Sequence, residues 1–408
     1  MQILRIQRPQ EIKQIMRDIK VDPYGIQIML PKAVFYLIKL NSISNITANI
    51  LKQEMLSLGG DVALARGALT GKIKKTDCLL IGNLSQYNKL NLKLAKQPFG
   101  LKELSANLNL TLKNYQKESF TLDLGRSKLD LDARKTCIMG IMNLTPDSFS
   151  ADGLYKELPL TKEKNSGRVA LEYIVDYAQD LVVDGANIID LGGESSRPGA
   201  KPVSVKEELA RTIPVIKALA KKIKVPISID TYKPEIAQAA LDNGAIIVND
   251  ITGLENKKLA KLIAKHKAAV VIMHMRGVPR TMQKNPKYAS LIEDILGFLN
   301  AAAIRAQEAG ISKDKIIIDP GIGFGKTLEH NLEIIKRLGE LKVLGFPILI
   351  GTSRKLFIGK ILNAEPQDRI FGSISSCILA AINGAKILRV HDVKETKQAL
   401  KILNSIGN

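Results

Sequence analysis

The feature of this sequence that most restricts its fold is a series of short apolar runs in the last two thirds of the chain. The runs are rich in Ile and Val, do not alternate with polar residues, and end at a polar or glycine-rich turn. Such runs are typical of strands that are buried on both faces of a parallel sheet. They are Cys137–Met142, Asn187–Leu191, Pro226–Ile229, Ala245–Val248, Ala269–Met273, Ile316–Ile318, Pro347–Ile350 and Lys386–Val390.

Helix-length segments separate most of these runs. Their apolar residues recur at three- and four-residue spacing, which indicates amphipathic helices. Eight strand–helix units in about 270 residues match the size of a (β/α)8 or TIM barrel, an α/β fold. We therefore predict a barrel over residues 136–408. The clearest helical segments are Ala210–Lys221, Pro234–Asn243, Ile292–Ala309 and Asn331–Leu341.

The first 130 residues have a different texture. Leu/Ile-rich segments that also carry many lysines, such as Pro31–Leu58 and Lys102–Lys113, follow one another with few motifs. We expect a smaller N-terminal domain over residues 1–130, either α/β or mainly helical, of unknown function. Near its end an alternating run, Lys128-Leu-Asp-Leu-Asp, predicts either a short strand or a linker.

The bulk properties indicate a soluble cytoplasmic protein. The formal net charge of the 408 residues is +20, but the lysines are spread singly among Ile, Leu and Asn. This spread favours a solvated surface over a nucleic-acid site. The three scattered cysteines suit reduced thiols. We find no signal peptide and no stretch of about 18 apolar residues, so we expect no membrane association.

Polar residues follow nearly every apolar run, and their distribution separates two architectures. A doubly wound open sheet would gather ligand-binding residues at one switch point, after only a few strands. A barrel would bring the ends of all its strands into one mouth, which favours the barrel. The residues are Asn143, Glu194, Arg197, Asp230, Asn249, His274, Asp319, Lys355, Arg389 and His391.

These residue types indicate chemistry, although several have a purely structural alternative. The carbonyl oxygen of Asn143 could hold Mg²⁺ bound to a diphosphate, or the side chain could cap a turn. Arg197 could bind a phosphate or carboxylate, or lie in solvent on its Gly/Pro-rich loop. Asp230, Asn249 and Asp319 offer the acceptors and donors that a flat heterocycle needs. Asp230 could instead cap the helix expected from Pro234.

The last two runs are followed by positive charge. Lys355, Arg389 and His391 stand where barrels often hold phosphate groups, after the seventh and eighth strands. The segment Asp319–Thr327 is glycine-rich but is not a P-loop, because Pro320 stands where the Walker pattern needs Gly. We interpret it as a mobile loop in which Phe324 offers an apolar contact.

The ordered set of motifs between about residues 138 and 393 resembles the dihydropteroate synthase family. The motifs are IMGIMNLTPDSFS, GANIIDLGGESSRPGA, ISIDTYKP, GAIIVNDITG, IMHMRGVPRTMQ, DPGIGFGKTLEHN, GTSRK and RVHDV. The resemblance implies a transferase of folate biosynthesis. It would condense 6-hydroxymethyl-7,8-dihydropterin pyrophosphate with p-aminobenzoate to give 7,8-dihydropteroate and pyrophosphate. It also implies a Mg²⁺ cofactor, a homodimer and a sulfonamide target.

The resemblance further implies roles for individual residues. Asn143 would bind Mg²⁺ and, with Arg389 and His391, the pyrophosphate. The residues implied to hold the pterin are Asp230, Asn249, Met275, Asp319, Lys355 and Arg389. Those implied to surround p-aminobenzoate are Asp152, Ser196, Arg197, Pro198, Phe324 and Ser353. Those implied to act in catalysis are Asp230, Lys355, Arg389 and His391.

The sequence departs from the family pattern at three places, and two rival functions remain. Ser196 stands where many family members carry Thr, and Leu356 where many carry Ser. The loop Ser150-Ala-Asp-Gly-Leu, which carries Asp152, differs from the usual Ser-Asp-Gly-Gly. A pterin-binding methyltransferase would keep the pterin site but would have no use for the diphosphate site. A non-catalytic paralogue would be expected to lose Asn143, Arg389 or His391, and all three are present.

Overall fold

The structure is a computed structural model that describes residues 1–4, 6, 9–125, 128–132, 135–144, 166–195 and 202–406. The chain divides into two compact units, Met1–Lys113 and Asn114–Asn408. This division falls earlier than the boundary near residue 130 that we expected from the sequence. Residues 120–131 form a hairpin that packs with the strands of the second unit.

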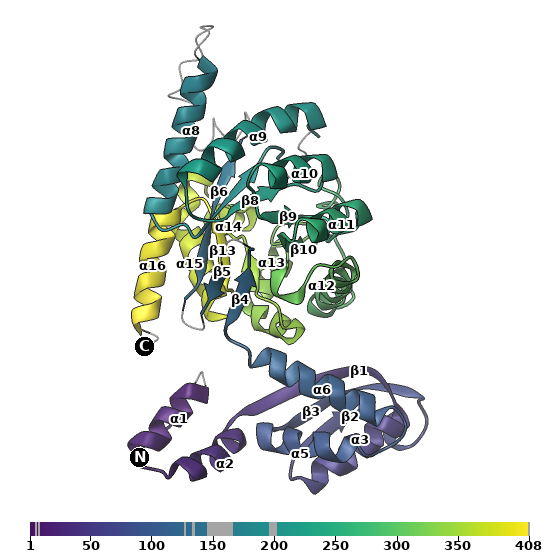
Figure 1. The fold of residues 1–408 in the computed structure, drawn as a ribbon. Coiled ribbons are helices and arrows are strands. Elements are labelled where there is room, and N and C mark those ends of the chain that lie inside the picture. The colour runs from purple at the N-terminus through teal and green to yellow at the C-terminus, as the bar shows by residue number, and fades with distance from the viewer. Residues whose placement is uncertain are drawn as a thin grey trace. The chain divides into compact units, whose positions relative to one another are not determined.

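The N-terminal unit contains a three-stranded antiparallel sheet and helices, which is the α/β rather than the mainly helical alternative (Figure 1). The sheet order is β1-β3-β2. On β3 the buried residues Thr76, Cys78 and Leu80 alternate with more exposed ones, so one face of the sheet packs on helices. The elements are α1 (Pro9–Asp18), α2 (Pro23–Ala33), β1 (Phe35–Ser44), α3 (Asn45–Ser57), β2 (Asp61–Leu64), α4 (Arg66–Leu69), β3 (Lys75–Asn83), α5 (Leu84–Leu94) and α6 (Leu101–Tyr115).

The second unit is a parallel eight-stranded barrel, which confirms the predicted (β/α)8 fold. Its strand order is β11-β10-β9-β8-β7-β6-β13-β12, and a bridge between Ile318 and Ile348 joins the two ends of this series. Each strand lies within one of the predicted runs or extends it by one or two residues. The strands are β6 (Cys137–Asn143), β7 (Ile188–Gly192), β8 (Ile227–Asp230), β9 (Ile247–Asp250), β10 (Ala269–Met273), β11 (Ile316–Asp319), β12 (Leu349–Ile350) and β13 (Ile387–Val390).

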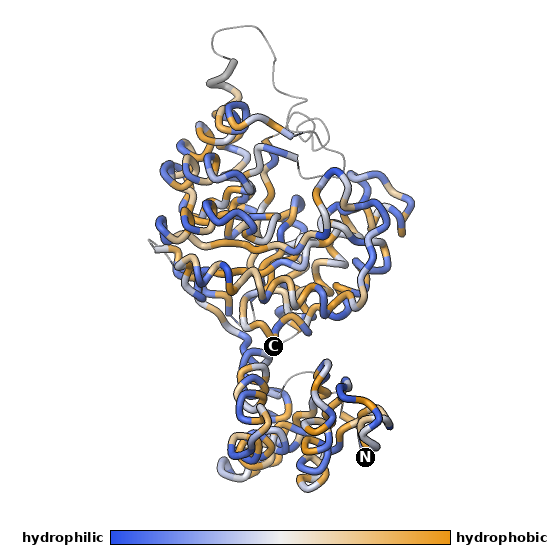
Figure 2. The backbone as a smooth tube through the Cα atoms, turned by 90° about the vertical axis from the view of Figure 1, so that its right-hand side faces the viewer, coloured by the Kyte–Doolittle hydropathy of each residue, from blue (hydrophilic) through white to orange (hydrophobic). Residues whose placement is uncertain are grey.

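Helices surround these strands (Figures 1 and 2). The predicted helix Asn331–Leu341 is wrong in its second half, because α13 ends at Lys336 and a 3-10 helix, η2 (Leu338–Leu344), follows it. The helices are α8 (Ser166–Val183), α9 (Val205–Lys222), α10 (Pro234–Asp242), α11 (Lys257–Lys265), α12 (Leu291–Glu308), α13 (Leu328–Lys336), α14 (Leu356–Leu362), α15 (Ile370–Ile382) and α16 (Val393–Ile406), with the 3-10 helices η1 (Lys313–Lys315) and η3 (Pro366–Arg369).

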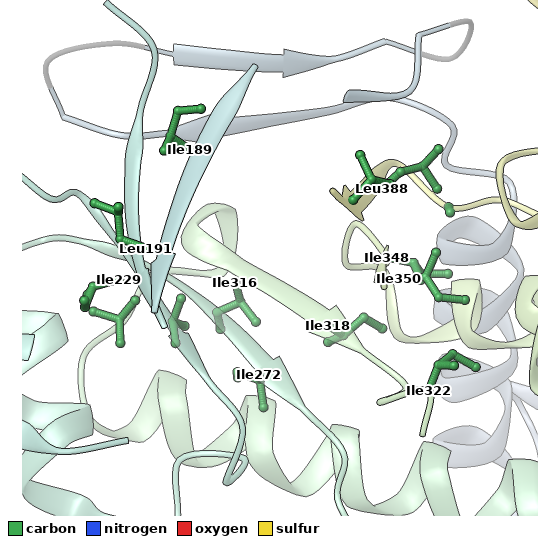
Figure 3. Packing of buried hydrophobic residues seen from close by; sticks show 14 of the residues in the cluster. Ile189, Leu191, Ile229, Ile272, Ile316, Ile318, Ile322, Ile348, Ile350 and Leu388 are labelled. Carbon is green, nitrogen blue, oxygen red and sulfur yellow. The ribbon is translucent and has the colours of Figure 1, made fainter. Parts of the chain in front are cut away.

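Alternation along the strands divides the apolar residues between two layers. Ile189 and Leu191 on β7 belong to the layer that packs against the helices, as does Ile272 on β10 (Figure 3). The residues in the other phase, such as Ile188 and Val271, form a separate cluster. Because successive strand side chains point to opposite faces, this second cluster fills the interior of the barrel.

A hairpin closes the floor of that interior. It consists of β4 (Phe120–Asp123) and β5 (Lys128–Leu131), which pair antiparallel. Leu122 and Leu131 belong to the same cluster as Ile188 and Ile387, the first residues of β7 and β13. The alternating run near residue 130 is therefore a strand, and the amino-terminal end of the barrel is covered by apolar side chains.

Two further findings concern the cysteines and the length and hydropathy of the helices. The cysteines Cys78, Cys137 and Cys377 are free and buried, and burial raises the pKa of each thiol to about 11. They therefore remain protonated at neutral pH. In the described part of the chain, no helix is both long enough and apolar enough to span a bilayer.

Candidate active site

On β7, β9, β11 and β13, the polar residues of the barrel mouth point to the same face as the apolar residues of the barrel floor. On β7, Asp190 follows Ile188 by two residues, and on β13 Arg389 follows Ile387 by two. Residues two apart on a strand face the same way, so these charged side chains enter the barrel at the carboxyl ends of the strands. The other pairs are Ile247 with Asn249 and Ile317 with Asp319.

Arg389 links two carboxylates in this mouth. Its Nε donates to Asp190 Oδ2 at 2.7 Å and its Nη2 donates to Asp230 Oδ2 at 2.7 Å. Asn249 pairs in register with Asp230, and its Nδ2 donates to Asp190 Oδ2 at 3.2 Å. The alternative role of Asp230 as a helix cap is wrong, because Lys233 stands at the N-cap of α10.

The surroundings of Asp230 and Arg389 shift the pKa of both side chains. Burial raises the pKa of Asp230 to about 7, although Arg389 lowers it; Asp190 raises it further. Burial lowers the pKa of Arg389, but the two carboxylates raise it by more, so the guanidinium stays charged. Asp190 is fully buried, and its Oδ1 has no hydrogen-bond partner among the residues that the structure describes. A ligand with N–H donors would satisfy such an oxygen.

Asp319 supplies a further carboxylate on the opposite part of the rim, at the end of β11. Its Oδ1 accepts a hydrogen bond from Gly321 N at 2.7 Å. Burial raises the pKa of Asp319 to about 6, while the Gly321 N–H and the cations of Lys355, Lys326 and Arg389 lower it. Lys355 and Arg389, predicted from the sequence as site residues, therefore act electrostatically on Asp319.

The glycine-rich segment after β11 is shaped by close backbone contacts. Gly321 has φ +69°, and a Cβ at this position would lie 2.0 Å from the carbonyl oxygen of His274. Only glycine fits there. The turn places Phe324 under Lys355, whose Nζ lies 4.4 Å from the ring centroid in a cation–π contact. Phe324 is buried. The contact joins Phe324, expected from the family resemblance to lie near p-aminobenzoate, to Lys355, expected to hold the pterin.

An apolar wall stands beside the charged groups. Phe324 packs in a small cluster with Ile251, Met273 and Met282. Met275, predicted to contact the pterin, packs against this cluster. A planar ligand could therefore meet hydrogen-bonding groups along its edge and apolar side chains on its face.

Asn143 lies close to this charged group, at the end of β6. A Cβ built on Gly192 would lie 3.4 Å from Asn143 Oδ1 and 3.7 Å from Asp230 Cβ. The bare backbone of Gly192 therefore keeps a narrow space between these two side chains. After β12 and β13, Ser353 Oγ lies 3.1 Å from His391 Nδ1 and accepts from His391 N at 3.2 Å.

The base of the loop after β7 is fastened by a buried ion-pair network. Lys233 Nζ donates to Glu208 Oε2 at 2.6 Å, to Glu194 Oε2 at 2.5 Å and to Val203 O at 2.6 Å. Val203 N in turn donates to Glu194 Oε2 at 3.0 Å. The predicted site residues on this and the preceding loop lie outside the described residues; they are Asp152, Ser196, Arg197 and Pro198.

Sequence reasoning missed Asp190 and Lys326 as site residues. Asp190 lies inside an apolar run, whereas the sequence indicated candidates among the polar residues that follow the runs. A charged residue whose side chain faces the barrel interior is the signal that identifies it. Lys326 is buried at the end of the glycine-rich segment, whose sequence pattern indicated only a loop. Leu356, noted as a departure, is 57% exposed at the start of α14.

A barrel mouth with a carboxylate–amide–guanidinium cluster, an apolar wall and neighbouring cations is suited to a flat, hydrogen-bonding heterocycle. The sequence pattern of the family described as pterin binding enzyme matches residues 139–391, more than half of the chain. Fold and site thus define a pterin-binding enzyme.

Comparison with known proteins shows which family of pterin-binding enzymes the chain resembles. The chain is 44% identical to a dihydropteroate synthase of Synechocystis sp. over 287 residues, which is 70% of this chain and 94% of that protein. A crystal structure of the Yersinia pestis dihydropteroate synthase with a sulfonamide drug complex matches with a TM-score of 0.64 at 40% identity, covering 71% of this chain and 99% of that one. The chain belongs to the dihydropteroate synthase family.

A third relative concerns the N-terminal unit. A probable bifunctional folylpolyglutamate synthase/dihydropteroate synthase of Halobacterium salinarum is 34% identical over 385 residues. The match covers 94% of this chain and 44% of that protein, so it extends beyond the barrel into the N-terminal unit. This unit therefore has a counterpart in a relative and is not peculiar to this chain.

Proposed function

We propose that this transferase joins p-aminobenzoate to 6-hydroxymethyl-7,8-dihydropterin pyrophosphate, giving 7,8-dihydropteroate and pyrophosphate. The observation that carries the proposal is the cluster of Asp190, Asp230, Asn249 and Arg389 in the barrel mouth. It presents carboxylate acceptors, an amide and a guanidinium to a ligand that has adjacent N–H donors and ring acceptors.

The pterin would enter with its donor edge toward the carboxylates. Asp190 Oδ1 is a buried acceptor without a partner, and Asp319 is a second buried carboxylate. The ring face would lie against the apolar wall that contains Phe324 and Met275. Buried unpaired acceptors destabilise a protein, so a ligand that donates to them gains affinity and specificity.

The diphosphate would lie toward Asn143, Arg389 and His391. Asn143 Oδ1 is a hard oxygen ligand, and Mg²⁺ commonly combines one or two protein oxygens with those of a substrate diphosphate. When bound, Mg²⁺ would neutralise charge on the leaving diphosphate.

The reaction would be dissociative. The bond between the pterin methylene carbon and the diphosphate oxygen breaks first, and the amino nitrogen of p-aminobenzoate then captures the carbon and loses a proton. The carboxylates of Asp190, Asp230 and Asp319 would stabilise positive charge on the pterin. Lys355, with Nζ over the Phe324 ring, would orient the pterin.

Pterin-binding methyltransferases and non-catalytic paralogues are the alternatives. The conjunction of Asn143 beside Gly192 with Ser353 and His391 near Arg389 favours a site for a diphosphate, which neither alternative needs. We therefore retain catalysis as the proposal.

We also propose a cytoplasmic homodimer. Helices α15 and α16 expose large apolar side chains, among them Phe371 and Ile406, which are 79% and 80% exposed. Two copies that cover these helices with each other would remove this apolar surface from water. Light scattering at several concentrations tests this: a mass of 44.7 kDa throughout would reject the dimer.

The activity test measures pyrophosphate and dihydropteroate together. Purified protein is incubated with Mg²⁺, the pterin pyrophosphate and p-aminobenzoate. Equal amounts of the two products are expected. Tight pterin binding without pyrophosphate release would instead indicate a paralogue or another acceptor.

A further inference from the structure

Lys326 is a buried lysine to which the proposed reaction assigns no role. It follows the glycine-rich segment after β11, and only 3% of its surface is exposed. Its Nζ lies 2.9 Å from His274 Nδ1 and donates to Phe324 O at 3.0 Å and to His274 O at 3.4 Å. The lysine therefore joins the end of β10 to the segment after β11.

The number of acceptors around Nζ fits the charged form. An ammonium group carries three hydrogens, and Lys326 has three acceptors: two carbonyl oxygens and a ring nitrogen. Burial, together with the charge of Lys326, lowers the pKa of His274 to about 2, so the ring is neutral and Nδ1 can accept.

The segments after β10 and β11 approach each other closely at His274, which also binds Lys326. His274 O, one of the three acceptors, is also the atom that excludes any side chain from Gly321. Gly321 N holds Asp319 Oδ1 at 2.7 Å. A change at Lys326 would thus be transmitted to Asp319 through a short, packed path.

We propose that Lys326 is a positioning residue: it fastens the segments after β10 and β11 to each other, and through them its side chain and positive charge act on the Asp319 carboxylate, which accepts N–H hydrogens from a ligand. The inference rests on the proposed function, since a pterin is the ligand that supplies such donors. Lys326 acts through Asp319 and does not itself touch the substrate.

The electrostatic surroundings support this role. Burial raises the pKa of Asp319, and the groups that lower it are Gly321 N–H, Lys355, Lys326 and Arg389. Burial lowers the pKa of Lys326 to about 7, against the raising effect of Asp319 and with a lowering effect of Lys355. Asp319 and Lys326 thus favour each other's charged form. Loss of the lysine charge should therefore raise the pKa of Asp319.

The first test is the pH dependence of kcat/KM for the pterin substrate in Lys326→Gln. Glutamine keeps hydrogen-bond donors but removes the charge. We expect the acidic limb to move to higher pH by up to about one unit, the size of a nearby charge effect. Lys336→Gln is the matched control, because it removes the same charge from an exposed position on α13 and should leave the limb unchanged. Asp230, whose pKa burial raises to about 7, contributes to the same limb, so the carboxyl titration of Asp319 described below decides the outcome if the limb does not move.

Lys326→Arg keeps the charge, so its limb should stay at the wild-type pH even if KM rises; a limb that moves overturns the proposal. A second measurement needs no activity. The carboxyl ¹³C signal of Asp319, assigned by its loss in Asp319→Asn, is titrated in ligand-free protein. Its midpoint should rise in Lys326→Gln, and an equal midpoint overturns the inference. If the wild type makes no dihydropteroate, the proposed function fails while this titration still decides the role of Lys326.

Discussion

The two units of the chain differ in what they bury. In the described part of the N-terminal unit the buried polar residues are neutral: Thr76, Asn91 and Ser105. The barrel unit buries charges, among them Asp190 and Lys326. Burial of a charge is costly unless the charge is paired, so its presence marks positions that serve something other than stability.

The difference has a simple origin in the strands. In the N-terminal sheet the inward phase of β3 continues as apolar or weakly polar residues, and helices cover it. In the barrel the inward-facing residues change from apolar to polar or charged within the last three residues of β7, β9, β11 and β13, at Asp190, Asn249, Asp319 and Arg389. One end of the barrel is therefore a hydrophobic floor and the other a charged mouth. The comparison predicts that substitutions in the mouth affect activity, and those in the N-terminal core affect only stability.

The largest expected effect is that of Arg389→Leu. It would leave Asp190 and Asp230 without their cation, which lowers the free energy of unfolding by about 3 kcal/mol. It would also lower kcat/KM by about 10³-fold, as for removal of a group that stabilises charge in a transition state. Thermal unfolding and steady-state kinetics measure both. Arg337→Leu, at a half-exposed ion pair on the surface, should change stability by less than about 1 kcal/mol. Equal effects of the two variants would contradict the comparison.

Asp319→Asn should separate binding from stability. The amide oxygen can still accept from Gly321 N, and the burial cost of the carboxylate disappears, so the melting temperature should stay or rise. The pterin substrate would lose a charged acceptor, and its KM should increase about 100-fold. A KM equal to that of the wild type would show that Asp319 does not contact the pterin.

Lys233→Met tests whether the mouth depends on the network below it. The substitution leaves Glu208, which is 1% exposed, without its cation and frees Val203 O. We expect a loss of about 3 kcal/mol in stability and about a tenfold loss in kcat/KM for p-aminobenzoate. The double variant Lys233→Met/Glu208→Gln should recover part of the stability. If the double variant is no more stable than Lys233→Met, the unpaired Glu208 carboxylate is not the cause of the stability loss.

The sequence predicted the barrel well because strands buried on both faces leave continuous apolar runs that local pattern reveals. The sequence also indicated candidates among the residues that follow those runs. In the structure, Arg389 bonds to both Asp190 and Asp230, and Asn249 bonds to Asp190. Asp190 itself escaped notice because its role depends on strand phase within a closed barrel, and not on its position after a run.

Other features needed tertiary contacts. The hairpin β4–β5 could have been a linker, and only the packing of Leu122 and Leu131 against the barrel floor assigns it to the second unit. Lys326 lies in a glycine-rich segment that the sequence indicated only as a loop. Its hydrogen-bond acceptors belong to Phe324 and to His274, which lies 52 residues earlier in the sequence. A contact between residues so far apart cannot be inferred from local patterns.

The smallest expected effect is in the core of the N-terminal unit, and it is the sharpest test of the comparison. Tyr87 is fully buried, and its hydroxyl lies 3.0 Å from both Tyr36 O and Leu80 O. Tyr87→Phe removes the one hydroxyl hydrogen that these two carbonyl oxygens share and should cost about 1 kcal/mol. Tyr24→Phe, at a position that is 72% exposed, is the control and should cost nothing measurable. Because the charged groups proposed to act on the substrates belong to the barrel, kcat/KM should equal the wild-type value in both variants. A lower kcat/KM in Tyr87→Phe, at a temperature where the variant is fully folded, would mean that the N-terminal unit contributes to the reaction.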